Sequence, residues 1–184
     1  FLMRFIVWML IHSVYRLEKA GLEKIPDEGP ALIVCNHVSF VDALVIAAAC
    51  RRPIRFVMDH RIFRLPLISF VFRTGRAIPI APAKEDAAMM ERAFDEVSAA
   101  LREGELVGIF PEGRITDSGE LYPFRPGVTR ILERDPVPVI PLALQGGIRE
   151  AAQQRLGVRV SGSVEDLQRA AHFHDLPGVH HGHS

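Results

Sequence analysis

The chain has 184 residues, which suits one domain with a hydrophobic core of ordinary size. Its 22 basic and 22 acidic side chains balance to a net charge of zero, so the composition gives no sign of a nucleic-acid partner. Hydrophobic residues make up 48% of the chain, near the upper end of the range for globular proteins. The two cysteines, Cys35 and Cys50, lie in apolar surroundings, and we expect both to be reduced and buried.

Residues 1–19 are expected to form an amphipathic helix that associates with a membrane. The uninterrupted apolar run 5–11 is far shorter than the roughly 20 residues that span a bilayer. Two arginines and the aromatic side chains of Trp8 and Tyr15 surround an apolar body, which is typical of a helix in the membrane interface. A helix packed into the core and the end of a spanning helix from a transporter-like domain upstream are the alternatives. Because the chain opens on Phe1 instead of Met, we expect a fragment or an excised domain.

Beyond residue 20, apolar runs alternate with helical patterns. Strands are predicted at 31–35, 54–58, 77–80, 105–110 and 137–144. Helices are predicted at 39–50, 86–102 and 128–133, with a short helix pair over 62–72. The helix 86–102 is the clearest, because its apolar residues recur at three- and four-residue steps and a glycine follows it. Strands separated by helices predict an α/β fold, with helices on the faces of a sheet.

The segment 36–42, which reads NHVSFVD, follows the first predicted strand and holds His37 and Asp42. An imidazole can take a proton near neutral pH, and a carboxylate can hold its tautomer. Because residues five positions apart do not share a helix face, we expect His37 in the turn and Asp42 in the first helical turn, reaching back. The positive end of the helix would help to keep the ring neutral. The alternatives are a structural histidine and a helix capping box formed by Ser39 and Asp42.

A Ser-His-Asp hydrolase is not favoured by this segment. Ser39 lies only two residues from His37 and fits a helix N-cap better than a nucleophile. The chain has no G-x-S-x-G elbow, and Cys35 lies inside a predicted strand.

Three more motifs follow in order: GRAIPI at 75–80, FPEG at 110–113 and VPVIP at 137–141. Together with NHVSFVD at 36–42, they resemble the ordered signature blocks of the glycerolipid and lysophospholipid acyltransferase family. Those blocks are N-H-x4-D, G-x-[IV]-x-[IV], F-P-E-G and V-P-[VI]-x-P. The resemblance covers roughly residues 20 to 145, and four blocks in order at compatible spacing make it specific.

The resemblance implies a central, mixed, mostly parallel sheet flanked by helices, with the acyltransferase domain over 20–150. It also implies that His37 is the catalytic base and Asp42 its partner. Glu112, Gly113 and Arg114 match the block that binds the phosphoglycerol part of the acceptor, and an arginine fork suits a phosphate.

Two blocks depart from the family pattern. The family often has Thr before the arginine that here follows Gly113 directly, which leaves open where Arg114 points and favours the branch fused to transporter or acyl-activating domains. A solvated loop charge is the alternative for Arg114. The family also often has an arginine after the second block, where this chain reaches Lys84.

Gly75, Arg76 and Lys84 are therefore predicted to be substrate-binding, with Lys84 or Arg76 holding the acceptor phosphate. The alternative for Lys84 is a surface charge at a helix start. A weakened phosphate grip would suit a lysophospholipid with a larger head group than lysophosphatidic acid.

The VPVIP block is expected at a sheet edge or at strand ends, because its prolines limit ladder hydrogen bonds. In the family it lines the acyl-chain side of the site. Residues 151–184 are expected to form an atypical, partly disordered tail. Its histidines could bind metal, although a disordered tail is favoured; they are His172, His174, His180, His181 and His183.

The predicted function is an O-acyltransferase that moves a fatty acyl group from acyl-CoA or acyl carrier protein to a lysophospholipid hydroxyl. We expect action at a membrane surface, on the cytoplasmic face of the bacterial inner membrane. No cofactor and no core metal site are expected, because proton transfer alone suffices. An inactive lipid-binding module and an acyl thioesterase are the alternatives.

Overall fold

The computed structural model describes residues 2–39, 41–115, 122–147 and 154–160, and these contain one sheet of seven strands. The strands are β1 (Tyr15–Ala20), β2 (Ala31–Cys35), β3 (Ile54–Asp59), β4 (Ile78–Ile80), β5 (Leu106–Ile109), β6 (Val139–Gly147) and β7 (Gln154–Val160). The helices are α1 (Leu2–Val14), α2 (Asp42–Ala49), α3 (Pro66–Thr74), α4 (Ala83–Arg102) and α5 (Gly127–Arg134), with the 3₁₀ helices η1 (Leu22–Lys24) and η2 (His60–Arg64).

The sheet has the order β1-β7-β6-β2-β5-β3-β4. The strands β6, β2, β5, β3 and β4 are mutually parallel, and β6–β7 is the antiparallel pair among the described strands. The predicted mixed, mostly parallel sheet flanked by helices is therefore confirmed. The strands and helices predicted between residues 31 and 144 are also confirmed, with ends that differ by a few residues.

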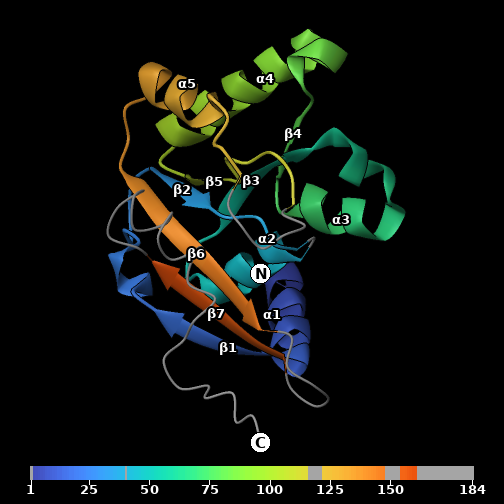
Figure 1. The fold of residues 1–184 in the computed structure, drawn as a ribbon, viewed down its shortest axis with the longest axis vertical. Helices are drawn as coiled ribbons and strands as arrows, with labels where there is room; N and C mark the ends of the chain where they lie inside the picture. The colour runs from blue at the N-terminus through green and yellow to red at the C-terminus, as the bar shows by residue number, and fades with distance from the viewer. Residues whose placement is uncertain (1, 40, 116–121, 148–153, 161–184) are drawn as a thin grey trace, which may run out of the picture.

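Each face of the sheet is covered by a different pair of helices (Figure 1). In β2, Ile33 and Cys35 join the core cluster that contains α2 and part of α1. Leu32 and Val34 point the other way, into the cluster that contains α4 and α5. This strict alternation follows from the two-residue period of a strand, and burial on both faces explains why β2 reads as an unbroken apolar run.

Two strands lie outside the predicted set. The N-terminal helix, expected over 1–19, ends at Val14, and β1 follows it directly. β1 pairs in parallel with β7, which falls in the segment expected to be an atypical tail. A strand this polar is stabilised by a partner about 140 positions away in sequence, and local pattern carries no information about such a partner. The rest of the predicted tail, with its histidines, lies outside the described residues.

The prolines of the VPVIP block were expected at a sheet edge or at strand ends, and Pro138 does directly precede β6, but Pro141 lies inside this interior strand. β6 lies between β2 and β7, and Pro141 pairs with Val34 of β2. β7 pairs with β6 only from Leu142 onward, so β6 has a single partner at Pro141. The missing N–H of the proline is tolerated there, because no second ladder is present to receive it.

Helix α1 combines a packed face with an exposed apolar face. Ile11 is buried and contributes to the core beside α2. The large apolar residues on the exposed face of α1 are Leu2, Phe5, Trp8, Met9, Leu10 and Val14. The core-packed interpretation therefore holds for one face of this helix, and membrane association of the other face stays a prediction. Within the described residues, no helix is both long enough and apolar enough to cross a bilayer.

Candidate active site

His37 lies in the turn between β2 and α2, where the parallel strands of the sheet end. Its Nδ1 atom is 2.9 Å from Oδ2 of Asp42, the first residue of α2. The same carboxylate oxygen accepts the backbone N–H groups of Val38 and Ser39, both at 2.7 Å. An oxygen that accepts two amide protons is an acceptor for the ring as well, so the proton of this pair belongs on Nδ1. The other ring nitrogen, Nε2, is left with its lone pair for a reacting proton.

Asp42 contacts the turn before α2 as well as the imidazole ring. The N–H of Ser39 donates to Asp42, and the Ser39 hydroxyl accepts the N–H of Val41 at 3.3 Å. However, the N-cap of α2 is Val41, and no side chain caps this helix. The expected capping box and N-cap role of Ser39 are therefore wrong, although both side chains stabilise the turn.

Burial of Asp42 and partial burial of His37 restrict the orientation and the accessible side of the imidazole ring. Asp42 is 1% exposed, and its second oxygen, Oδ1, has no hydrogen-bond partner among the residues that the structure describes. The side chain of His37 is 17% exposed, so the ring is accessible at one side only. The ring stacks on Phe110 at 4.2 Å between centroids, and Phe110 stacks on Phe56 of β3 at 5.9 Å. Hydrogen bonds and stacking together fix the direction of the imidazole.

Glu112 ties the turn of His37 to the loop after β5. It is 2% exposed, and its Oε1 accepts the backbone N–H of His37 at 2.9 Å. Its Oε2 accepts the backbone N–H of Tyr122, also at 2.9 Å. Both carboxylate oxygens of Glu112 are therefore hydrogen-bonded to backbone N–H groups of the protein. This arrangement favours a positioning role for Glu112 over the predicted direct contact with substrate, which stays a prediction.

Asn36 links the same turn to β6, the neighbour of β2 on the other side from β5. Its side chain donates to the carbonyl of Leu144 at 3.0 Å and accepts the N–H of Leu144 at 2.7 Å. Leu144 belongs to β6, so three adjacent strands are linked at their carboxyl ends through Asn36 and Glu112. Since both side chains are buried and hydrogen-bonded, they hold the turn in one position.

Two arginines lie on the loop that contains Gly113. The guanidinium of Arg114 covers the ring of Tyr122 at 3.6 Å, so it is held by a cation–π contact on the exposed side of the loop. Gly113 has a φ of 65°, and a Cβ there would lie 2.7 Å from Nε of Arg125. The positive φ favours glycine here, whereas the flexible side chain of Arg125 could move away from a Cβ. Sequence reasoning did not select Arg125, although its place before the helix-opening Pro126-Gly127 marks a loop residue near this block.

The three residues predicted from the second block lie in different places. Lys84 is exposed in the first turn of α4, at the carboxyl end of β4. Gly75 and Arg76 lie at the amino end of β4, and Arg76 pairs with Glu105 at 2.5 Å.

The strand register separates Arg76 from the His37–Asp42 pair. Ile78 of β4 pairs with Val57 of β3, so Arg76 is at the level of Arg55, two residues earlier in each strand. Arg55 pairs with Val107 of β5, and Val107 pairs with Leu32 of β2, so Arg76 is at the level of Leu32. Arg76 therefore lies five residues and three strands from His37, or about 20 Å at roughly 3.3 Å per residue and 4.8 Å per strand. This position does not favour a contact between Arg76 and an acceptor phosphate, and that role stays a prediction.

Cys35 and Cys50 are free and buried, as expected. Burial, followed by the nearby carboxylates of Asp42 and Glu112, raises the pKa of the Cys35 thiol well above its ordinary value. Burial also raises the pKa of Cys50 to about 11. Neither thiol is a nucleophile near neutral pH, because the thiolate is the reactive form.

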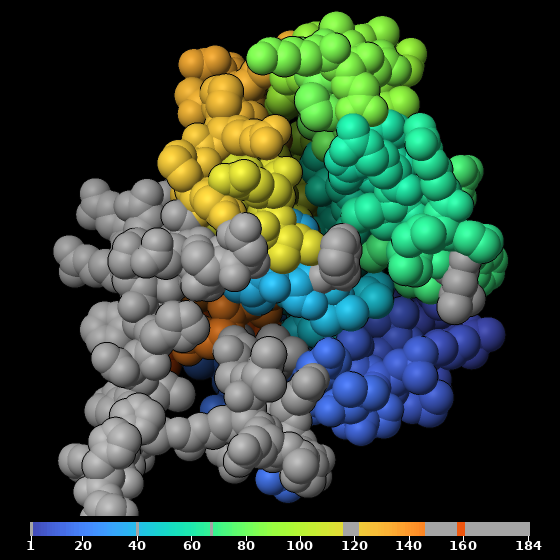
Figure 2. All heavy atoms as spheres, turned by 45° about the vertical axis from the view of Figure 1, so that its right-hand side comes forward, coloured from blue at the N-terminus to red at the C-terminus, as the bar shows by residue number. Residues whose placement is uncertain are grey.

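The surface beside the site is hollowed between the loop after β5 (yellow) and η2–α3 (teal), with the α2 region (cyan) below (Figure 2). A separate cavity of about 540 Å³ lies between α3 and α4, and neither His37, Asp42 nor Arg114 lines it. The hollow and this cavity are therefore different features.

We expect Glu112→Gln to destabilise the fold, because its amide nitrogen would face one of two backbone N–H donors. The free energy of unfolding should fall by about 1–3 kcal/mol, the typical cost of an unsatisfied buried group. Urea denaturation measures this, with exposed Glu133→Gln on α5 as the control for removing one negative charge. Unchanged stability in Glu112→Gln would contradict the positioning role.

Comparison with known proteins identifies related sequences and a related fold. A family model described as Acyltransferase matches residues 16–145. The chloroplastic 1-acyl-sn-glycerol-3-phosphate acyltransferase BAT2 of Brassica napus is 28% identical over 137 residues, which are 74% of this chain and 39% of that protein. The 1-acyl-sn-glycerol-3-phosphate acyltransferase of Borreliella burgdorferi is 27% identical over 131 residues, 67% of this chain and 49% of that protein. The chain thus spans less than half the length of these two relatives.

The crystal structure of the 1-acyl-sn-glycerophosphate acyltransferase PlsC from Thermotoga maritima has the same fold. It aligns with a TM-score of 0.70 and 18% sequence identity, covering 92% of this chain and 73% of that one. The family match covers well over half of the chain and includes all four motifs. The chain therefore belongs to the Acyltransferase family.

Proposed function

We propose that this chain is the acyltransferase domain of an enzyme that transfers a fatty acyl group from a thioester to the free hydroxyl of a lysophospholipid. The observation that carries the proposal is the buried contact of Asp42 Oδ2 with His37 Nδ1, which leaves Nε2 of an oriented ring available. The family match and the names of the relatives support lysophosphatidic acid as one acceptor.

In the proposed reaction, Nε2 of His37 takes the proton of the acceptor hydroxyl as its oxygen attacks the thioester carbonyl. Asp42 stabilises the positive charge that forms on the ring, because it accepts the hydrogen bond from Nδ1. The tetrahedral intermediate collapses with cleavage of the carbon–sulfur bond. The departing thiolate then recovers the proton from Nε2, so the ring is neutral again and no other group changes its protonation.

The acceptor's phosphate is assigned to the cationic loop next to Glu112. Arg114 is exposed and held over Tyr122, while the Arg125 side chain packs beside Gly113. Guanidinium groups bind phosphate oxygens through paired hydrogen bonds. Lys84 remains a candidate for a second contact, because it lies at the same carboxyl edge of the sheet.

The exposed apolar residues suggest how the domain meets a membrane. Helix α1 lies on the same side of the molecule as η2 and α3 (Figure 2), and Leu65, Ile68 and Phe70 are exposed there. Large apolar side chains on two neighbouring helices suit insertion into the headgroup region. A membrane on this side would present lysolipid to the hollow beside His37, and we assign it to the cytoplasmic leaflet.

Replacing His37 should remove the activity and leave the fold. Because general base catalysis contributes about 10²–10⁴-fold, His37→Ala should lower kcat by at least about 100-fold. The measurement is acyl transfer to lysophosphatidic acid and to lysophosphatidylethanolamine from acyl-CoA and from acyl carrier protein, with circular dichroism to monitor folding.

The products of that panel separate the alternatives. Free fatty acid formed equally with and without lysolipid would indicate a thioesterase, and a folded wild-type protein without turnover would indicate a lipid-binding module. A strong preference for lysophosphatidic acid would exclude an acceptor with a larger head group.

Asp42→Asn should separate the two duties of this carboxylate. The amide oxygen can still accept the N–H groups of Val38 and Ser39, whereas the ring loses its anionic partner. We expect kcat/KM to fall by about 10²–10⁴-fold with a change in unfolding free energy below about 1 kcal/mol. Asp42→Ala should also lose the hydrogen bonds from these two N–H groups and be less stable than Asp42→Asn. Equal stability of the two variants in urea denaturation would contradict the dual role.

Membrane binding should depend on the exposed face of α1. Phe5→Glu combined with Trp8→Glu removes two large apolar groups, each contributing about 1.5–3 kcal/mol when fully buried, so partitioning should fall at least tenfold. Sedimentation with anionic phospholipid vesicles measures the partitioning. Thr129→Glu, on exposed α5 at the other face of the sheet, is the control. Partitioning of the double variant equal to that of wild type would reject α1 as a membrane contact.

A further inference from the structure

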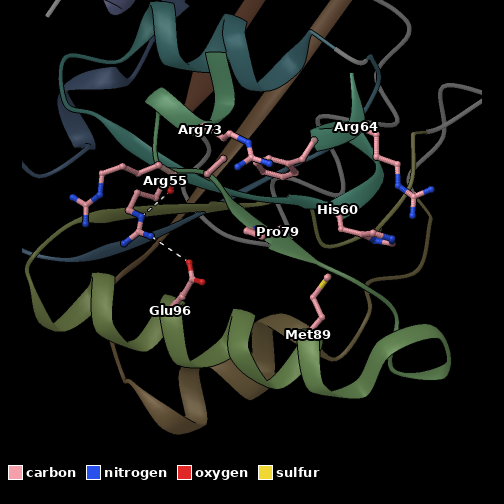
Figure 3. Close-up of a pocket in the computed structure, with 10 residues that line it drawn as sticks. Arg55, His60, Arg64, Arg73, Pro79, Met89 and Glu96 are labelled. Atoms are coloured by element: carbon pink, nitrogen blue, oxygen red, sulfur yellow. Dashed lines mark hydrogen bonds and ion pairs between the residues drawn. The ribbon is translucent and has the colours of Figure 1, made fainter. Parts of the chain in front are cut away.

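The cavity between α3 and α4 is lined mainly by basic side chains (Figure 3). We call it the α3–α4 groove and define it by His60, Arg64, Arg73, Arg76, Arg55 and Glu96. Its volume of about 540 Å³ lies in the range of small-molecule sites, roughly 300–1,000 Å³. It is distinct from the hollow beside His37, and the proposed reaction does not use it.

The positive charges of the groove are only partly neutralised. Arg55 lies 3.3 Å from Glu105 and 3.6 Å from Glu96, and Arg76 also pairs with Glu105. In contrast, Arg64 and Arg73 form no ion pair with any residue that the structure describes. Arg73 is held in place by a hydrogen bond from its Nε to the hydroxyl of Ser69 at 2.9 Å. Two exposed guanidinium groups at one concave site are suited to bind phosphate groups.

The groove extends along β4, from the carboxyl edge of the sheet towards its amino end. His60 and Arg64 follow β3 at the edge that carries His37. Arg73 lies at the other end, because its carbonyl accepts the N–H of Arg76, which precedes β4. Since Arg76 lies about 20 Å from His37 on the strand register, the groove places cationic groups both near the reaction edge and far from it.

We propose that the α3–α4 groove binds the phosphate groups at the nucleotide end of an acyl-CoA donor. This inference rests on the proposed function, and it selects CoA as the carrier of the acyl group. About thirteen bonds separate the sulfur of CoA from its first phosphorus, which extends to about 15 Å at the roughly 1.2 Å per bond of an extended chain. A thioester at His37 would therefore bring the pyrophosphate and the ribose phosphate to the level of Arg73.

The acceptor phosphate does not fit this position. In a lysophosphatidic acid, about four bonds join the reacting hydroxyl to the phosphorus, which allows a reach of about 5 Å. A hydroxyl at His37 keeps that phosphate near Arg114, at the carboxyl edge.

The test is calorimetric titration of the full chain with CoA, with dephospho-CoA and with inorganic phosphate. CoA should bind more tightly than dephospho-CoA, and inorganic phosphate only weakly. Arg64→Ala combined with Arg73→Ala should weaken CoA binding by about tenfold for each arginine removed. Arg102→Ala is the matched control, because this arginine is 72% exposed near the far end of α4, outside the groove.

Kinetics supply the second readout. The double variant should have a higher KM for acyl-CoA. Its kcat and its KM for the lysolipid should be unchanged. Wild-type affinity for CoA in the double variant, or a rise in KM for the lysolipid instead, would overturn the groove assignment.

The titration also separates this inference from the proposed function. His37→Ala should bind CoA with wild-type affinity, because it removes only the base. CoA binding that depends on the groove arginines, in a protein without acyl transfer, would reject the proposed function and support the groove. Acyl transfer from acyl carrier protein by a chain that does not bind CoA would reject the groove assignment and support the proposed function.

Discussion

A single carboxylate oxygen organises this domain's reactive edge. Oδ2 of Asp42 accepts two backbone N–H groups from the β2–α2 turn and faces Nδ1 of His37. The start of α2, the shape of the turn and the direction of the imidazole are therefore determined together. The turn that brings the two amides to Oδ2 also brings the ring to it, and stacking on Phe110 completes the orientation of the ring. The positive end of α2 lies nearby and favours the anion, which offsets part of the cost of burying Asp42.

Side chains of neighbouring strands then hold this turn against the sheet. Asn36 makes a two-bond contact with Leu144 of β6, and Glu112 links the N–H of His37 to the N–H of Tyr122. Polar groups at the carboxyl ends of parallel strands are a general way to build a site in α/β proteins. Here the same feature explains why the proposed base, His37, follows the short buried strand β2. It lies between β6 and β5, so both neighbours can support the turn.

The sequence predicted most of the core and the reactive pair, because both are local. Apolar runs marked the buried strands, and a spacing of five between histidine and aspartate required a turn followed by a helix start. It did not predict β1 and β7, which stabilise one another across about 140 positions of sequence. It also could not reveal that Glu112 spends both oxygens on backbone N–H groups. A glutamate at position 112 is equally compatible with substrate contact and with a positioning role. Only the folded loop after β5 distinguishes these two roles.

In the proposed reaction, distance along the sheet assigns the two basic regions to different parts of the substrates. Arg114 and Arg125 belong to the loop after β5, within a few residues of the carboxylate that contacts the His37 backbone. Arg73 and Arg76 lie at the opposite end of β4, where a phosphate four bonds from the reacting hydroxyl cannot reach. This separation is consistent with the second sequence block, 75–80, which lacks the arginine that often follows it in the family. If the arginine normally found after that block is absent, the grip on the acceptor depends on the loop after β5, while the cations along β4 are available to a longer ligand.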